Sequence, residues 1–215
     1  YSPTRDITFA VAGSNAVYVQ FKDAAGNVSS QYLDSVIADF APPATTGITI
    51  AGGAAYTNTP VVTLSLNATD NYSMASMNIA INGAWQGWMA YAPSKVITLT
   101  GGPTLLMASA AAPNRPARVL APLADGNQTV NAQFRDAAGN VSVIVTNTIF
   151  LDTTPPTGTV SINLNALYTN SPTTTLALTA TDNVSVANMR LNINGIVGAW
   201  QTFATSAQAV LTGAD

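Results

Sequence analysis

Apolar and polar residues alternate one by one along several segments of this chain. The pattern is clearest over residues 62–68, 77–81 and 130–134, where every second residue is apolar. A period of two is typical of a strand that buries one face and exposes the other. No segment keeps a helical period over three turns, so the pattern predicts an all-β protein. The expected core positions are Val62, Leu64, Leu66, Ala68, Met77, Ile79, Ile81, Val130, Ala132 and Phe134.

The sequence repeats itself after about 113 residues. FKDAAGNVS at residues 21–29 recurs as FRDAAGNVS at 134–142, and YTNTP at 56–60 recurs as YTNSP at 168–172. ATDN at 68–71 recurs at 180–183. A period of this length is that of a whole sandwich domain rather than of a solenoid unit. The second copy keeps the same alternation, which predicts buried side chains at Leu176, Leu178, Ala180, Met189, Leu191 and Ile193.

Pro-Pro pairs at 42–43 and 155–156 recur with the same period and mark the expected joints. Residues 1–42 then match only the C-terminal strands of a split domain, and 43–155 form a complete domain. Residues 156–215 match the N-terminal part of a further domain. The complete domain carries a loop insertion at 102–124, whose four prolines argue against a regular central strand. Because part of this insertion is apolar, we expect it to pack against its own domain or a neighbouring subunit.

The composition narrows the range of functions. Only 8% of the residues are charged, and all ten acidic residues are Asp, which favours turns over helices. The seven basic residues are scattered, so we expect no nucleic-acid partner, and no apolar run is long enough for a membrane span. Cys and His are both absent, which excludes disulfides, Cys/His zinc sites and an imidazole base. We therefore expect no enzyme and assign no catalytic, cofactor-binding or metal-binding residue.

The pentapeptide Asp-Ala-Ala-Gly-Asn, at 23–27 and 136–140, predicts a tight hairpin turn. Gly and Asn would take positive φ, and Asp would accept hydrogen bonds from N–H groups two residues ahead. A calcium loop is the alternative, because calcium binds carboxylate and amide oxygens. Its candidate ligands are Asp70, Asn71, Asp182 and Asn183, beside the linker residues Asp39 and Asp152. Each such site offers only one or two carboxylates, so turn chemistry is the favoured interpretation.

Three tryptophans offer a second candidate site. Trp88 and Trp200 occupy equivalent positions in the two copies, whereas Trp85 is present only in the first. Packing in the core or at its rim explains a repeated Trp most simply. Exposed rings would instead stack on a sugar ligand, and Trp85 is then the most informative of the three.

The repeated pattern F(K/R)DAAGNVS … PP … YTN(T/S)P … ATDN … ING resembles the bacterial Ig-like repeats of large surface and secreted proteins, of adhesin or filament type. The resemblance covers nearly all of the chain apart from the insertion. It implies tandem Ig-like antiparallel β-sandwiches, an extracellular or cell-surface location and no enzymatic activity. It also raises the expectation of calcium, because related adhesins are stiffened by ions at domain joints.

These observations favour a structural extracellular protein, the scaffold of a cell-surface stalk or filament that acts in cell adhesion. Its partners would be neighbouring repeats end to end, or further copies of itself. The two incomplete domains have two interpretations. Either the chain is a window on a longer array, which is the simpler interpretation, or strands of one subunit complete the next. The second interpretation predicts that Val17, Val19 and Phe21 pack against a neighbour. A spacer or carbohydrate-binding module of a secreted enzyme is the alternative function.

Overall fold

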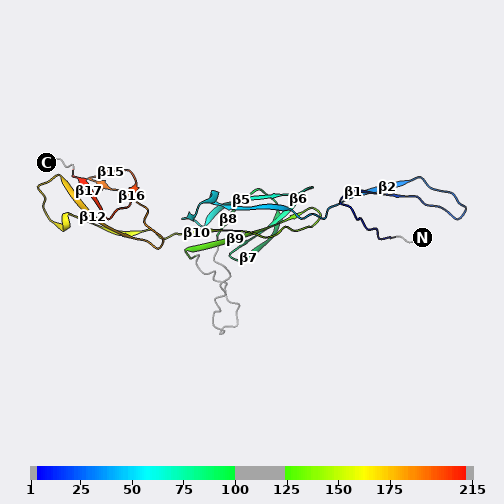
Figure 1. Ribbon diagram of the computed structural model, residues 1–215, viewed down its shortest axis with the longest axis horizontal. Coiled ribbons are helices and arrows are strands. Elements are labelled where there is room, and N and C mark those ends of the chain that lie inside the picture. Colours follow the sequence, from blue (N-terminus) through cyan, green and yellow to red (C-terminus); the bar gives the residue numbers. More distant parts are fainter. Residues whose placement is uncertain (1–3, 100–123, 212–215) are drawn as a thin grey trace, which may run out of the picture. The chain divides into compact units, whose positions relative to one another are not determined.

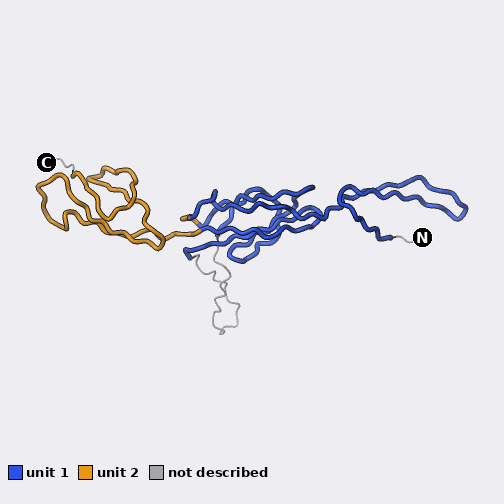
Figure 2. The backbone as a smooth tube through the Cα atoms, viewed as in Figure 1, with its two compact units in different colours: residues 1–55, 60–149 blue, residues 56–59, 150–215 orange. Residues whose placement is uncertain are grey.

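The computed structural model describes residues 4–99 and 124–211, and these residues form strands joined by turns (Figure 1). Apart from Ala124, the insertion at 102–124 lies outside the described residues. The chain divides into two compact units (Figure 2): unit 1 is residues 1–55 and 60–149, and unit 2 is residues 56–59 and 150–215. The helices in the described part are single 3₁₀ turns at Ala51–Gly53 and Asn163–Asn165. Neither has the length to cross a bilayer.

Two sheets build a sandwich around the core of unit 1. The first has the order β3-β5-β8. The second has the order β4-β10-β9-β6-β7, and the boundary between the units falls within β10. The bounds are β3 Ala44–Ile50, β4 Tyr56–Thr57, β5 Val61–Thr69, β6 Met74–Ile81, β7 Ala84–Ala90, β8 Ser94–Thr98, β9 Gly126–Asp136 and β10 Val145–Leu151. The pairs β3–β5, β5–β8, β6–β7 and β6–β9 are antiparallel, and β4 pairs parallel with β10.

This strand order is Ig-like. In an Ig sandwich the first, second and fifth strands share one sheet, and the third, sixth and seventh share the other. Here β3, β5 and β8 take the first set of places, and β6, β9 and β10 take the second. The extra strand β7 extends the second sheet at its edge. The expected all-β class and antiparallel sandwich are therefore confirmed.

The core of this sandwich is the one that the alternation predicts. All ten expected positions of the first copy are buried, and Leu64, Leu66 and Phe134 are fully so. Strand β5 shows the physical reason most clearly, because its nine residues alternate strictly between exposed and buried. Residues Ile48, Ile50, Ile97 and Ile149 join the same cluster from the neighbouring strands.

The second copy keeps the strand pattern but not the burial. Strands β11, β12 and β17 form one sheet. Two short pairs, β13 with β16 and β14 with β15, form further two-stranded sheets, and β13 and β14 correspond by sequence to β6 of the first copy. Their bounds are β11 Thr157–Ile162, β12 Thr173–Thr181, β13 Asn188–Met189, β14 Asn192–Ile193, β15 Ile196–Val197, β16 Gln201–Thr202 and β17 Ser206–Val210. Leu176 is buried, but Leu178, Ala180, Met189, Leu191 and Ile193 are only half-buried, so full burial was a wrong expectation there. In the first copy β9 pairs with the strand that carries the counterparts of Met189, Leu191 and Ile193, and residues 150–211 hold no counterpart of β9.

The first described strands form a hairpin. Strand β1 (Gly13–Val19) pairs antiparallel with β2 (Tyr32–Ala38), from Gly13 opposite Ala38 to Val19 opposite Tyr32. By sequence the two strands are the counterparts of β9 and β10. Most of the hairpin is exposed, including large apolar side chains such as Phe21 and Leu33.

Candidate functional site

Three aspartates from distant parts of the sequence meet in unit 1. One carboxylate oxygen from each of Asp39, Asp70 and Asp136 lies within 4.8 Å of the other two. Asp39 belongs to the linker after β2, Asp70 follows β5, and Asp136 is the last residue of β9. Asp39 and Asp136 are buried and Asp70 is half-buried. The cluster therefore joins the linker to two loops at one end of the sandwich.

The Asp136–Asn140 turn fixes one side of this cluster. Asp136 Oδ1 accepts hydrogen bonds from the backbone N–H of Gly139 (2.6 Å) and Asn140 (2.8 Å), and Asp136 Oδ2 accepts one from Asn140 Nδ2 (2.8 Å). The main backbone donors therefore lie three and four residues ahead, and the N–H of Ala138, two residues ahead, makes the smallest contribution to lowering the pKa of Asp136. Gly139 has φ 101° as expected, but Asn140 does not take positive φ, and its side-chain amide instead holds the aspartate.

The same hydrogen bonds keep Asp136 ionised. Burial raises the pKa of Asp136, but the hydrogen bonds from the side chain and backbone of Asn140, and from Gly139, outweigh it. The net pKa of Asp136 therefore lies below its usual value. Hydrogen bonds to a carboxylate favour its charged form, so this member of the cluster carries a negative charge at neutral pH.

Two asparagine side chains tie the linker to the loops. Asn140 Nδ2 donates to the backbone oxygen of Asp39 (3.0 Å), and Asn71 Nδ2 donates to Asp39 Oδ1 (3.2 Å). The backbone N–H of Ala41 also donates to Asp39 Oδ1, at 3.1 Å. The linker is thus held from both loops: Asn71 and the backbone of Ala41 hold the carboxylate of Asp39, and Asn140 holds its backbone oxygen.

Asp70 carries the feature that points to a ligand. Its Oδ1 accepts hydrogen bonds from the backbone N–H of Tyr72 (3.0 Å) and Ser73 (3.1 Å). Its Oδ2 is buried and has no hydrogen-bond partner. A buried carboxylate oxygen without a donor is costly, and two further carboxylates close by add repulsion. A cation placed among the three would remove both penalties.

The ligand set fits calcium. All three groups are carboxylates, which hard cations prefer, and Ca²⁺ accepts six to eight oxygens in flexible geometry. Asp39, Asp70 and Asp136 would hold the ion, and the ion would supply the positive charge that the cluster lacks. The expectation of one or two carboxylates per site thus does not hold here. Asp136 was expected only as a turn residue, separate from Asp39 and Asp70. The strand order brings it to them, because β9 lies beside β6 and Asp136 pairs with Met74, close to Asp70 in the sequence.

The second copy repeats part of this arrangement. Asp152 Oδ1 accepts from the N–H of Thr154 (3.2 Å), as Asp39 does from Ala41. Asp182 Oδ1 accepts from the N–H of Val184 (2.9 Å), and Asp182 Oδ2 is again buried without a partner. The counterpart of Asp136 does not occur in residues 150–211. The unpartnered oxygen is therefore a property of the repeat and not of one loop.

The turn of the exposed β1–β2 hairpin, at Asp23–Asn27, has the same hydrogen bonds as the Asp136–Asn140 turn. Asp23 accepts hydrogen bonds from the backbone N–H of Asn27 and from Asn27 Nδ2, both at 2.8 Å. These are the bonds that Asp136 receives from Asn140. They lower the pKa of Asp23, the side-chain bond from Asn27 most of all. The turn is thus formed in the same way in both places.

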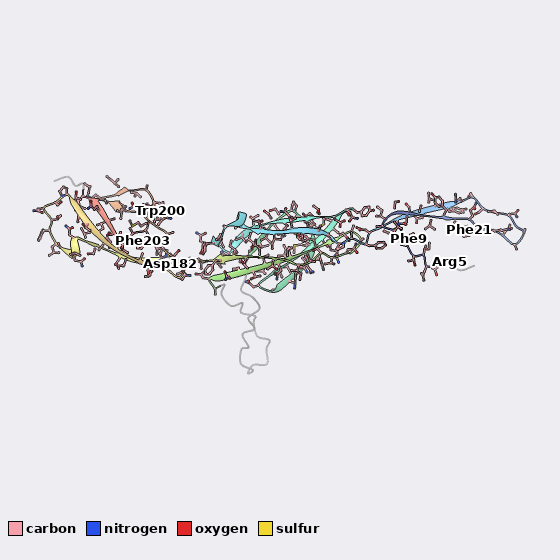
Figure 3. All side chains as sticks on the ribbon, viewed as in Figure 1. Arg5, Phe9, Phe21, Asp182, Trp200 and Phe203 are labelled. Carbon is pink, nitrogen blue, oxygen red and sulfur yellow. The ribbon has the colours of Figure 1, made fainter. Side chains whose placement is uncertain are left out.

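The tryptophans lie outside the core. Trp85 and Trp88 on β7 are 42% and 39% exposed. Trp200, which Figure 3 labels, is 65% exposed. The guanidinium of Arg135 lies 4.6 Å from the centroid of Trp88, and that of Arg190 lies 4.8 Å from Trp200. Neither Trp88 nor Trp200 is therefore buried in the core, so of the two expected placements, the core or its rim, only the core is ruled out. In both copies the equivalent ring instead takes part in a cation–π contact.

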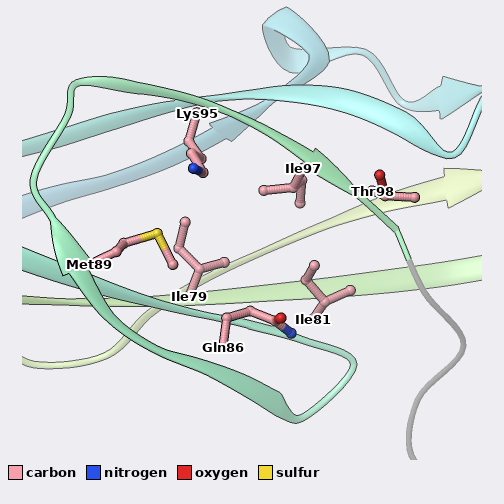
Figure 4. Close-up of a pocket in the computed structure, with 7 residues that line it drawn as sticks. All are labelled: Ile79, Ile81, Gln86, Met89, Lys95, Ile97 and Thr98. Carbon is pink, nitrogen blue, oxygen red and sulfur yellow. The ribbon is translucent and has the colours of Figure 1, made fainter.

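A pocket of about 290 Å³ opens between the edge strands β7 and β8 (Figure 4). It is lined by Ile79, Ile81, Gln86, Met89, Lys95, Ile97 and Thr98. Lys95 is the one ionisable group among these described lining residues. The pocket therefore offers no pair of acid and base groups of the kind that hydrolytic chemistry needs.

No protein-family model matches the chain, and no curated protein matches it. Several solved structures do. Fibronectin(III)-like modules of Clostridium thermocellum CbhA match with 12% identity and TM-score 0.36, over 67% of this chain and 65% of theirs. A tetra-tandem repeat from the extending region of a large adhesion protein matches with 22% identity and TM-score 0.36. A Ca²⁺-stabilised, ice-binding adhesin of an Antarctic bacterium matches with 18% identity and TM-score 0.35. Both adhesin matches cover 93% of this chain and 48% of theirs, so the chain spans about half the length of these structures.

Proposed function

We propose that this chain is part of an extracellular structural scaffold, a stalk or filament of tandem Ig-like repeats in which Ca²⁺ braces the entrance to each repeat. The observation that carries the proposal is the meeting of Asp39, Asp70 and Asp136 around the unpartnered oxygen of Asp70.

The position of the site explains how an ion would act. Asp39 lies in a linker that belongs to no strand, whereas Asp70 directly follows strand β5 and Asp136 ends strand β9 of the sandwich. An ion held by all three would restrict rotation of the linker relative to the domain that follows. Extracellular modules bind Ca²⁺ with dissociation constants on the order of 10⁻⁴–10⁻³ M, which suits a site of three carboxylates outside the cell.

Calorimetric titration of the chelator-treated chain with CaCl₂ tests the proposal directly. We expect saturable binding and a rise in the melting temperature of the complete sandwich. Asp136→Asn should abolish both effects, because it removes one of the three charges. Asp23→Asn is the matched control, since it changes the same residue in the same turn but outside the cluster. Equal melting temperatures in CaCl₂ and in excess EDTA, with no heat of binding, would contradict the calcium brace.

A spacer or carbohydrate-binding module of a secreted enzyme is the second candidate. Two exposed tryptophans on one edge strand, Trp85 and Trp88, favour it. The guanidinium of Arg135, which lies over the ring of Trp88, argues against sugar binding, because it shields part of the ring that a sugar would stack on. Quenching of tryptophan fluorescence by soluble polysaccharides, lost in Trp85→Ala, would favour this function over the scaffold.

A further inference from the structure

Trp85 and Trp88 project from the same face of β7, although residues at this spacing lie on opposite faces of a regular strand. The pairing of β7 with β6 shifts between Asn78 and Ala80, so that Trp88 pairs with Asn78 and Trp85 pairs with Ala80. Gly87, at φ 90°, lies in the part of β7 that holds the extra residue, which is a β-bulge. The bulge therefore places both indoles over one face of the sheet.

This face is the outer one of the second sheet. The neighbouring residues of β7, Gln86 and Met89, lie on the inner side, where they line the pocket together with Ile79 and Ile81 (Figure 4). Ile79 and Ile81 belong to the core cluster. Because side chains alternate across a strand, the two indoles lie on the side away from the core, where both are exposed.

The second copy repeats the capped tryptophan but not the pair of indoles. The contact between a guanidinium and an indole recurs there, at Arg190 and Trp200. Val197 and Ala199 stand at the positions of the additional indole and of the bulge glycine. Packing within the repeat therefore explains the contact that both copies make. It does not explain Trp85 and the bulge that turns it outward.

Arg135 adds a positive charge to the same face. Its Nε–H donates to Ser76 Oγ at 3.1 Å, and its guanidinium lies 4.6 Å from the centroid of Trp88. No carboxylate among residues 4–99 and 124–211 forms an ion pair with it. It is also the one charged residue among the described outward positions of β6, β7 and β9. A guanidinium fork matches the two oxygens of a carboxylate, so this face is complementary to an anion that carries one.

We propose that the outer face formed by Trp85, Trp88 and Arg135 binds a saccharide that carries carboxylates, a chain of uronic acids. The C–H face of a sugar ring stacks on the indole of Trp85, and the carboxylate pairs with Arg135. The guanidinium that shields Trp88 from a neutral sugar thus selects a charged one. The partners of the two indoles, Asn78 and Ala80, lie about 7 Å apart along β6, so a saccharide spans both rings and a compact anion does not.

A rigid sugar ring loses little conformational entropy on a flat face, which favours it over an extended acidic peptide. Such a site rests on the sugar-binding function named above as the second candidate. It does not rest on the calcium brace, because none of its three residues belongs to the three-aspartate cluster.

Calorimetric titration of the chain with oligogalacturonate, and with the same oligosaccharide fully methyl-esterified, tests the site. Both titrations are made in EDTA, so that calcium does not bridge the saccharide. We expect saturable binding of the acid and binding of the ester that is at least about tenfold weaker, because the ester keeps the sugar rings but removes the charge. Arg135→Gln should bind the acid and the ester equally.

Trp85→Ala should weaken binding of both saccharides by about tenfold or more and keep the preference for the acid. Trp200→Ala is the matched control and should change neither affinity, because that ring has a guanidinium over it but Val197 at the position of the second indole. Equal affinities of the unchanged chain for the acid and the ester would leave the second candidate function standing and overturn selection by charge. Binding of neither saccharide would overturn both. Equal losses in Trp85→Ala and Trp200→Ala would overturn the location of the site. The calcium brace stands or falls on the CaCl₂ titration alone.

Discussion

Asp70→Asn should stabilise the chain without calcium and destabilise it with calcium. Asparagine keeps an oxygen that accepts the hydrogen bonds from Tyr72 and Ser73. It also places an amide, in place of the unpartnered Oδ2, next to two carboxylates. The substitution therefore removes a buried charge that lacks a donor and introduces a donor for its neighbours. In CaCl₂ the same change removes a ligand and one of three negative charges.

The size of the effect follows from the distances in the cluster. Two unit charges 4.8 Å apart repel by about 1 kcal/mol at the dielectric constant of water and by about 3.5 kcal/mol at an effective constant of 20. Asp70 takes part in two such pairs, so we expect a gain in EDTA of at least about 2 kcal/mol. For a domain of this size, that gain raises the melting temperature by about 8 °C. The unchanged chain gains about 2.7 kcal/mol at 100 times the calcium dissociation constant, and the variant loses most of this.

Thermal unfolding followed by circular dichroism, in EDTA and in CaCl₂, measures both effects. Asp34→Asn is the control, because it makes the same change at an exposed residue outside the cluster. The reasoning is refuted if Asp70→Asn melts at a lower temperature than the unchanged chain in EDTA. It is also refuted if calcium raises the melting temperatures of both chains equally.

Three further predictions concern the sandwich and its turn. Phe134→Ala should lower the free energy of unfolding, measured by denaturant titration, by about 3–5 kcal/mol, because Phe134 is fully buried. Phe21→Ala should lower it by under about 1 kcal/mol in the monomeric chain, because Phe21 is exposed. Gly139→Ala should cost about 1–2 kcal/mol and weaken calcium binding, since φ is 101° there, and equal affinity in a calorimetric titration would contradict this. The pKa of Asp136 is lowered on folding, so its contribution to stability is present above the unfolded pKa and is lost as pH falls through the folded pKa. Asn140→Ala should raise that pKa in a carboxyl NMR titration of the calcium-free chain; an unchanged value would show that the amide of Asn140 is not its cause.

The sequence predicts the parts of the fold that local pattern controls. The alternation in β5, β6 and β9 identifies the core of the first copy, because each strand has one face against the other sheet. It does not foresee that Met189 and Leu191 remain half-buried, since their burial depends on a partner for the strand that pairs with β9 in the first copy, and residues 150–211 hold no counterpart of β9. Likewise, the aspartate turn is visible in the sequence as a turn. Its meeting with Asp39 and Asp70 is not, because it depends on how β9 lies beside β6.

The hydrogen bond from Asn140 to the backbone of Asp39 joins residues 101 positions apart, and it shows why an ion matters at this place. A contact between residues so distant in sequence carries a loop-closure entropy cost, and one hydrogen bond contributes only about 1 kcal/mol. The bonds from Asn71 and Asn140 alone therefore hold the linker weakly against three mutually repelling carboxylates. A bound cation makes the electrostatic energy of the cluster favourable, because each carboxylate is then attracted to a shared positive centre. Linker order in this chain should accordingly follow calcium occupancy, and amide hydrogen exchange at Ala41 should slow in CaCl₂ and return to its faster rate in EDTA.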